Sequence, residues 1–236
     1  EVFAAASLEL ARAAVALRDR EGWPIVGFDL AGEEAGYPAG DHREAYQYAH
    51  SHFLKKTVHA GEAYGPESIF QAITDCHADR LGHGTFLFSR EMILSRDIAD
   101  PDRYIELLAE YMASQRVGVE ACVTSNLQTT PSIGSVAEHP IAQMIARSMS
   151  VSVCTDNRLV SHTTVTSELA RIVFGLDLTP HQVRNLILAG FKGSFFHGSY
   201  TLKRAFVRAV IDRYEALERE CLGAVSTAHG WDDITP

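Results

Sequence analysis

The chain has 236 residues, of which 46% are hydrophobic and 22% charged, and its formal net charge at pH 7 is -9. This composition is typical of a globular protein with a sizeable buried core. The negative balance argues against a general binder of nucleic acid or acidic membranes, because such binding needs cations that neutralise phosphates. The expected ligand is therefore a small molecule.

Cysteine usage and hydropathy narrow the class further. The cysteines are scattered with no CxxC pair, so neither a zinc ribbon nor a disulfide framework is predicted; they are Cys76, Cys122, Cys154 and Cys221. No apolar run approaches the roughly 20 residues of a membrane span, and no signal peptide is recognisable. We therefore expect a cytoplasmic protein. Because the chain begins without Met inside a predicted helix, we expect it to be the remainder of a longer polypeptide.

Hydrophobic periodicity predicts strands that alternate with helices. Helices are expected at 1–20, 41–56, 65–73, 90–116 with a break at 99–101, 139–149, 166–174, 179–190 and 202–220. Strands are expected at 24–29, 57–58, 79–84, 117–123 and 151–155. Such alternation predicts an α/β fold with a parallel sheet, whose carboxyl edge holds the ligand. We expect one domain over 1–222 and a weakly ordered tail over 223–236; the oligomeric state stays open.

A metal-like pattern, His50-Ser51-His52, falls within the predicted helix 41–56, for which Asp41 is the expected N-cap. On a strand the two imidazoles would share a face. On a helix they point roughly 200° apart. We therefore interpret them as surface residues.

Polar residues recur where the predicted strands end: Asp29, His59, His83, Ser125, Asn126, Asp156 and Asn157. Taken singly, His59 could be a core histidine, and the nearby Glu62 could be a carboxylate at a helix N-terminus. The repetition on successive strands favours a shared site, because carboxyl ends of parallel strands meet at one edge.

The residue types at these positions suggest a reaction. His59 and Asp156 offer nitrogen and oxygen ligands to a divalent metal such as zinc. Zinc lowers the pKa of a bound water to about 7 and so supplies hydroxide. Glu62 could then pass a proton to the substrate, and His83 could stabilise the attacking hydroxide. The set predicts metal-assisted hydrolytic attack on an unsaturated carbon.

Five motifs, in this order and spacing, resemble the adenosine deaminase family of zinc amidohydrolases. They are TVHAGE (57–62), RLGHGT (80–85), CVTSNLQT (122–129), the His139-Pro140 pair and VCTDN (153–157). The similarity runs from about residue 24 to residue 194. The other zinc deaminase class, with its HxE and PCxxC signature, finds no match.

This resemblance implies a (β/α)8 barrel of TIM type that uses one zinc ion to convert adenosine or 2′-deoxyadenosine to inosine or 2′-deoxyinosine with release of ammonia, a step of purine metabolism. By motif, His59 would be a zinc ligand, and Glu62 would protonate purine N1. His83 would orient the hydroxide, and Asp156 would be both a zinc ligand and a partner of that hydroxide. Gly32 would meet purine N3 through its backbone N–H.

Two departures from the family pattern matter. The strand-borne HxH that supplies two further zinc ligands is absent, so we expect an incomplete barrel of about five C-terminal strands that lacks its N-terminal strands. This chain alone should then bind zinc weakly or not at all and be inactive. The second departure is Asn157, which stands where the family usually has aspartate. An asparagine NH2 donates to purine N7 at any pH, so we expect Asn157 to keep purine recognition.

Two alternatives stay open at this point. One is a deaminase of the same family that acts on free adenine or another 6-aminopurine derivative. The other is a non-catalytic member that keeps the pocket and binds a purine or a protein partner.

Overall fold

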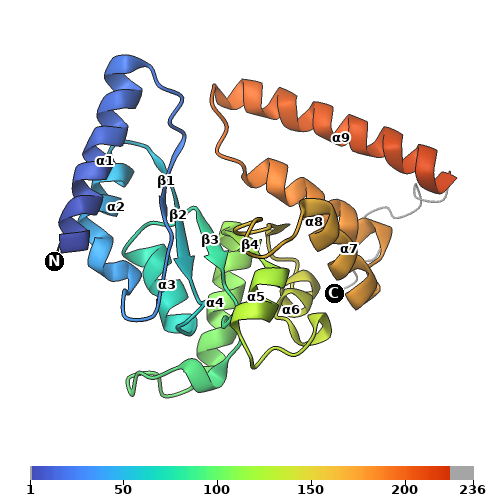
Figure 1. The fold of residues 1–236 in the computed structure, drawn as a ribbon, viewed down its shortest axis with the longest axis horizontal. Helices are drawn as coiled ribbons and strands as arrows, with labels where there is room; N and C mark the ends of the chain where they lie inside the picture. The colour runs from blue at the N-terminus through green and yellow to red at the C-terminus, as the bar shows by residue number, and fades with distance from the viewer. Residues whose placement is uncertain (1, 224–236) are drawn as a thin grey trace.

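The computed structural model describes residues 2–223 (Figure 1). The predicted tail at 223–236 lies, apart from Gly223, outside the described residues. No helix within 2–223 combines the length and the apolarity needed to cross a bilayer.

Strands and helices alternate along most of the chain. The strands are β1 (Gly27–Leu30), β2 (Lys55–Ala60), β3 (Arg80–His83), β4 (Gly118–Ala121) and β5 (Val151–Val153). The α-helices are α1 (Val2–Glu21), α2 (Arg43–Ser51), α3 (Pro66–Thr74), α4 (Pro101–Gln115), α5 (Val123–Thr129), α6 (Ile141–Ala146), α7 (Val165–Leu176), α8 (Pro180–Gly193) and α9 (Tyr200–Leu222). Short 3-10 turns are η1 (Ala39–His42), η2 (Arg90–Met92) and η3 (Val136–Glu138).

All strands of the described residues form one parallel sheet in the order β1-β2-β3-β4-β5. Their carboxyl ends therefore lie along one edge. Figure 1 shows the strands in the middle, with α1 and α2 beside β1 and with α7 and α8 beyond β4. Helix α8 packs against β5, and α9 packs against α8. The predicted α/β fold of TIM-barrel type is confirmed.

The core forms where short apolar strand residues meet the helices. Val58, Leu81 and Val119 are fully buried on neighbouring strands, and Ile69 of α3 and Met112 of α4 are buried with them. Burial of such side chains stabilises the fold by about 1.5–3 kcal/mol each. The register Val58↔Leu81↔Val119 places the three in one row, so the strand ends are held in step.

The predicted helix 41–56 is too long at its C-terminal end. Helix α2 ends at Ser51, and Phe53 adopts the left-handed conformation with φ 60° before β2 begins at Lys55. The two lysines that open β2 look like a polar helix end in the sequence. In the structure both bind the carboxylate of Asp79, and Lys56 is 3% exposed.

The helix caps differ from the one expected in the sequence. Asp100, at the predicted break 99–101, is the N-cap of α4 and accepts from the Arg103 N–H at 3.0 Å. Asp41 is not the N-cap of α2, because it lies inside η1 and the N-cap residue is His42, which makes no side-chain capping bond.

The predicted strand at 117–123 and the predicted helices at 139–149 and 90–116 also need correction. Strand β4 ends at Ala121 and α5 follows at Val123, so Thr124, Ser125 and Asn126 lie on a helix. The buried carboxylate of Glu168 accepts from the Thr124 N–H at 3.0 Å and so supports this early helix start. Helix α6 covers only Ile141–Ala146, and the helix expected from residue 90 is split into η2 and α4.

Candidate metal and catalytic site

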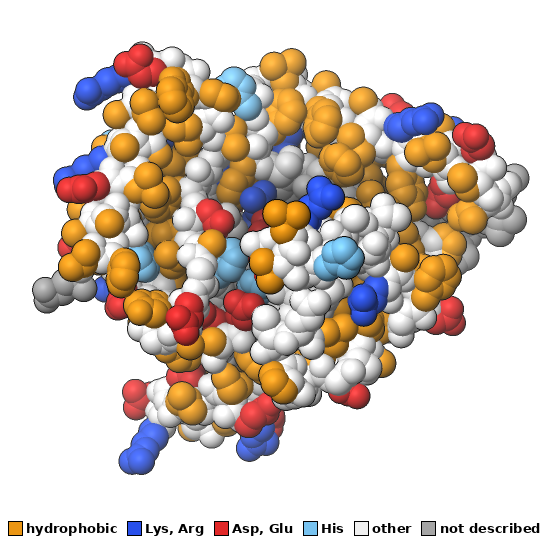
Figure 2. All heavy atoms as spheres, in the orientation of Figure 1, with side chains coloured by type: hydrophobic (Ala, Val, Ile, Leu, Met, Phe, Trp, Pro, Cys, Tyr) orange, Lys and Arg blue, Asp and Glu red, His pale blue; other side chains and the backbone are white. Residues whose placement is uncertain are grey.

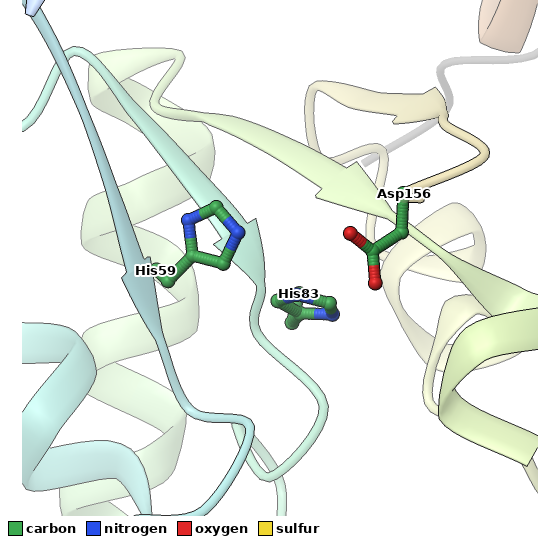
Figure 3. Close-up of side chains that lie close together, drawn as sticks. All are labelled: His59, His83 and Asp156. Carbon is green, nitrogen blue, oxygen red and sulfur yellow. The ribbon is translucent and has the colours of Figure 1, made fainter. Parts of the chain in front are cut away.

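Three of the predicted site residues converge at the carboxyl edge of the sheet. His59 lies at the end of β2, His83 is the last residue of β3, and Asp156 follows β5. One nitrogen or carboxylate oxygen from each lies within 4.8 Å of the others. Figure 3 shows the three side chains turned toward one shared space. Asp156 follows His83 by 73 positions and His59 by 97 positions in the sequence, and the parallel strands bring the three residues together.

Figure 2 shows histidine and acidic side chains gathered in the middle of the viewed face, where the surface is hollowed. His83 is 2% exposed and His59 is half-buried, whereas Asp156 is exposed. The site is therefore walled on the side of β3 and open to solvent on the side of β5.

Unusual backbone conformations aim these side chains. His83 and Asp156 have φ of 68° and 53°, in the left-handed region that costs a non-glycine residue about 1–3 kcal/mol. The sheet tolerates this cost where the chain must turn sharply after a strand. Gly82 allows a close approach, since a Cβ there would lie 3.0 Å from Nδ1 of the His59 ring.

Carboxylates surround the imidazole of His59. Burial alone lowers the pKa of His59, but the negative charges of Asp29, Glu62 and Asp156 outweigh burial and leave that pKa raised. Oδ1 of Asp29 lies 3.7 Å from Nδ1 of His59, too far for a hydrogen bond. That buried nitrogen has no hydrogen-bond partner among residues 2–223. The surroundings of His59 therefore favour a cation.

Glu62 lies beside the same three residues. Its Oε2 is 3.6 Å from Nε2 of His83. Burial raises the pKa of Glu62, the charge of His59 lowers it, and Asp156 and Glu34 raise it, so the net direction is upward. A carboxyl group with a raised pKa is suited to deliver a proton.

Neighbouring polar groups hold the site residues in place. Ser125 Oγ donates to Oδ2 of Asp156 at 2.8 Å, which fixes the orientation of that carboxylate. Nδ2 of Asn126 lies 3.1 Å from Nδ1 of His83, and Oδ1 of Asn126 lies 3.1 Å from Nε2 of His139. Burial lowers the pKa of both His83 and His139 to about 4, so both rings are neutral at pH 7.

Glu34 organises the loop that carries Glu62. This 5% exposed carboxylate accepts from the backbone N–H groups of Gly61, Glu62 and Ala63 at 2.9, 2.8 and 2.6 Å. The hydroxyl of Ser68 also donates to it at 2.7 Å. The sequence alone did not indicate this role for Glu34. Its one signal is that Glu34 follows soon after the strand end Asp29 and the expected purine contact Gly32, and nothing nearby predicts contacts with Gly61 and Ser68, which lie 27 and 34 positions later.

The two expected purine-binding residues lie on loops after β1 and β5. Gly32 has φ 118°, a conformation open to glycine, and the space where a side chain would stand is empty, so its backbone is accessible. Oδ1 of Asn157 accepts from the Val160 N–H at 3.2 Å, which leaves the NH2 group free to donate. Their contacts with a purine stay predictions.

The His50-Ser51-His52 pattern lies away from this cluster. His50 and Ser51 end α2, and the His50 ring stacks on the ring of His77 at a centroid distance of 4.1 Å. Neither His50 nor His52 belongs to the group of possible metal ligands found within residues 2–223.

The cluster fits a divalent metal ion on the chemistry of its donors. His59 and Asp156 offer a nitrogen and an oxygen within reach of one another, and their surroundings are rich in carboxylates. His83 is the third member, and its Nδ1 already faces the amide of Asn126. These assignments to single residues stay predictions.

Comparison with known proteins agrees with the family indicated by the sequence motifs. The sequence matches the family model described as Adenosine deaminase over residues 3–212. An adenosine deaminase from Mycobacterium sp. (strain JLS) is 39% identical over 194 residues, which cover 81% of this chain and 51% of the relative. One from Mycolicibacterium vanbaalenii is 37% identical over 215 residues, 91% of this chain and 57% of the relative. The chain thus spans about half the length of the curated relatives it matches.

Solved structures agree on the fold. An adenine deaminase from Arthrobacter aurescens has a TM-score of 0.71 at 23% identity, covering 90% of this chain and 58% of that one. An N6-mAMP deaminase from Arabidopsis has a TM-score of 0.68 at 28% identity, covering 89% and 55%. The family match, the relatives and the order of the site motifs lead to one conclusion: this chain belongs to the adenosine deaminase family.

Proposed function

We propose that the whole protein deaminates a 6-aminopurine by hydrolysis, with adenosine or 2′-deoxyadenosine as substrate. Water adds at C6, the 6-amino group leaves as ammonia, and the product is inosine or 2′-deoxyinosine. The observation that carries this proposal is the convergence of His59, His83 and Asp156 with the carboxyl group of Glu62 beside them.

Each residue has a defined part in the proposed reaction. Glu62 donates its proton to purine N1, which makes C6 a better electrophile; its raised pKa favours the protonated form that this step needs. His59 and Asp156 would hold one Zn²⁺, and a bound zinc ion supplies hydroxide near neutral pH. His83 donates a hydrogen bond from Nε2 toward the attacking oxygen. Gly32 and Asn157 hold N3 and N7 of the ring.

A second substrate class, free adenine or an AMP derivative, is favoured by a specific observation. Proteins of similar fold include one named adenine deaminase and one named N6-mAMP deaminase. The same chemistry at C6 serves adenine, adenosine and AMP derivatives, because the leaving amine and the ring are shared. The sugar or phosphate contacts decide among them, and none of the residues discussed above reads the sugar.

The test is ammonia release by the zinc-loaded whole protein with adenosine, 2′-deoxyadenosine, adenine, AMP and N6-methyl-AMP. The proposal expects the highest kcat/KM with the two nucleosides. Preference for adenine or a nucleotide would move the assignment to the second class. Turnover of none, with zinc bound, would support a non-catalytic purine-binding member.

A further inference from the structure

A line of buried hydrogen bonds runs from the backbone to the ring of His83. The Ile141 N–H donates to Nδ1 of His139 at 3.1 Å. Nε2 of His139 lies 3.1 Å from Oδ1 of Asn126, and Nδ2 of Asn126 lies 3.1 Å from Nδ1 of His83. Asn126 is 0% and His139 1% exposed, so water does not compete for these bonds.

The backbone N–H at one end determines every proton position along this line. A backbone amide can only donate, so Nδ1 of His139 must be an acceptor. The neutral ring of His139 then carries its proton on Nε2 and donates it to Oδ1 of Asn126. The Asn126 amide is thereby oriented with its NH2 toward His83. Nδ1 of His83 accepts, and its proton must lie on Nε2.

We propose that Asn126 and His139 are positioning residues that hold His83 in the Nε2–H tautomer, so that His83 is a hydrogen-bond donor in the site and not a metal ligand. Nδ1 of His83 is occupied by Asn126, and Nε2 has no free lone pair. His59 differs, because its buried Nδ1 has no hydrogen-bond partner among residues 2–223. The functional consequence rests on the proposed deamination, in which His83 donates toward the attacking oxygen.

Pro140 helps to place the Ile141 N–H, the backbone donor at which this line of hydrogen bonds begins. It stands between His139 and Ile141 with φ -61° and has no N–H of its own. The chain therefore turns so that the next N–H, that of Ile141, faces back to the His139 ring. The His139-Pro140 pair thus acts on His83, 56 positions earlier in the sequence, through Asn126.

The direct test is ¹⁵N NMR of the histidine rings in the protein at pH 7.5, assigned with His83→Gln and His139→Gln. Long-range ¹H–¹⁵N correlations distinguish a protonated ring nitrogen from one with a lone pair. We expect the Nε2–H form for both His83 and His139. A proton on Nδ1 of His83 in the unmodified protein would overturn the proposal, with no variant required.

Asn126→Asp reverses the polarity of the line. A carboxylate only accepts, so it draws a proton onto Nδ1 of His83 while His139 keeps its Nε2–H. We expect Nδ1 of His83 to become protonated in Asn126→Asp. Asn126→Leu, which has similar size and no polar group, should leave a mixture of the two tautomers. The exposed Asn185→Asp is the matched control and should leave the His83 signals unchanged.

Activity then separates this inference from the proposed function. In the zinc-loaded whole protein, Asn126→Asp should lower kcat for adenosine at least tenfold with KM changed less than threefold, because substrate binding does not involve Nδ1 of His83. If Asn126→Asp changes the tautomer of His83 but leaves kcat unchanged, the positioning role of Asn126 is overturned. If the unmodified whole protein deaminates no purine, the proposed function fails, and the tautomer measurement still decides the hydrogen-bond line.

Discussion

The backbone N–H of Glu62 donates to Oε2 of Glu34 at 2.8 Å, so the proposed proton donor stands on a loop that a second, buried glutamate holds. The same carboxylate binds the N–H groups on both sides of Glu62. Glu34 therefore controls where the Glu62 side chain begins, although it contacts no reacting atom.

Glu34→Gln should disturb this loop. A glutamine has one carbonyl oxygen and an NH2 group, so at least one backbone N–H now faces another donor. We expect a loss of about 2–4 kcal/mol in the free energy of unfolding, from two or more hydrogen bonds to a charged group. Urea denaturation measures this loss. The adjacent Glu33 is exposed, and Glu33→Gln should change stability by less than about 0.5 kcal/mol; equal effects of the two substitutions would refute the role of Glu34.

Glu62→Gln removes the proposed acid while keeping the shape of the side chain. Deamination by the zinc-loaded whole protein should fall by roughly 10²- to 10⁴-fold in kcat, the usual contribution of a general acid. Zinc content, measured by atomic absorption, should not change, because Glu62 is not an expected ligand. Near-normal turnover would contradict its assignment.

Asn157→Asp tests the proposed hydrogen bond to purine N7. The NH2 of Asn157 is free to donate at any pH, whereas an aspartate donates only when protonated. Affinity of the variant for a purine nucleoside should therefore weaken as pH rises through the pKa of the new aspartate, and affinity of the unmodified protein should not show this step. Calorimetric titration across the aspartate pKa of about 4, up to neutral pH, measures both. Parallel profiles would exclude the N7 contact.

Asp79 is expected to stabilise the start of β2. Burial alone raises the pKa of Asp79, but the ammonium groups of Lys55 and Lys56, at 2.7 and 3.0 Å, outweigh burial and lower it. A carboxylate whose pKa is lower in the folded state stabilises above its unfolded pKa of about 4 and loses this contribution as pH falls through the folded value.

Asp79→Asn should therefore destabilise the protein by about 3 kcal/mol at pH 7, since the nearly buried Lys56 ammonium loses its charged partner. The difference between variant and unmodified protein should shrink on acidification below about pH 4. Thermal unfolding at pH 7 and pH 3 measures it. Asp75→Asn, which breaks a more exposed ion pair with Arg43, is the control and should cost less than about 1 kcal/mol. A difference that grows on acidification would contradict this account.

The sequence predicted the architecture well, because the architecture depends on hydrophobic periodicity. Apolar runs between the predicted helices located every strand of the described sheet, and parallel strands necessarily bring their carboxyl ends to one edge. The sequence alone therefore predicts that His59, His83 and Asp156 meet, as they do in the structure. The order and spacing of the five sequence motifs indicated the adenosine deaminase family, to which the chain belongs.

The sequence could not predict the groups that support the site, because these act across long separations. Glu34 contacts residues 61–64 and 68, Glu168 contacts Thr124, and the hydrogen bonds from His139 reach His83 through Asn126. Element ends were missed for a similar reason. Lys55 and Lys56 look like a continuation of the helix in the sequence, because nothing nearby reveals that both bind Asp79, which lies 24 and 23 positions later.

The most direct test of the account is metal removal and return in the whole protein, followed by ammonia release from adenosine. Chelation should abolish the release, and one equivalent of Zn²⁺ should restore it in the unmodified protein. Asp156→Ala should not recover at the same zinc concentration, because one proposed ligand is gone. Full activity after complete removal of the metal, or full recovery of Asp156→Ala, would contradict the claim that these strand ends form one metal-dependent deaminase site.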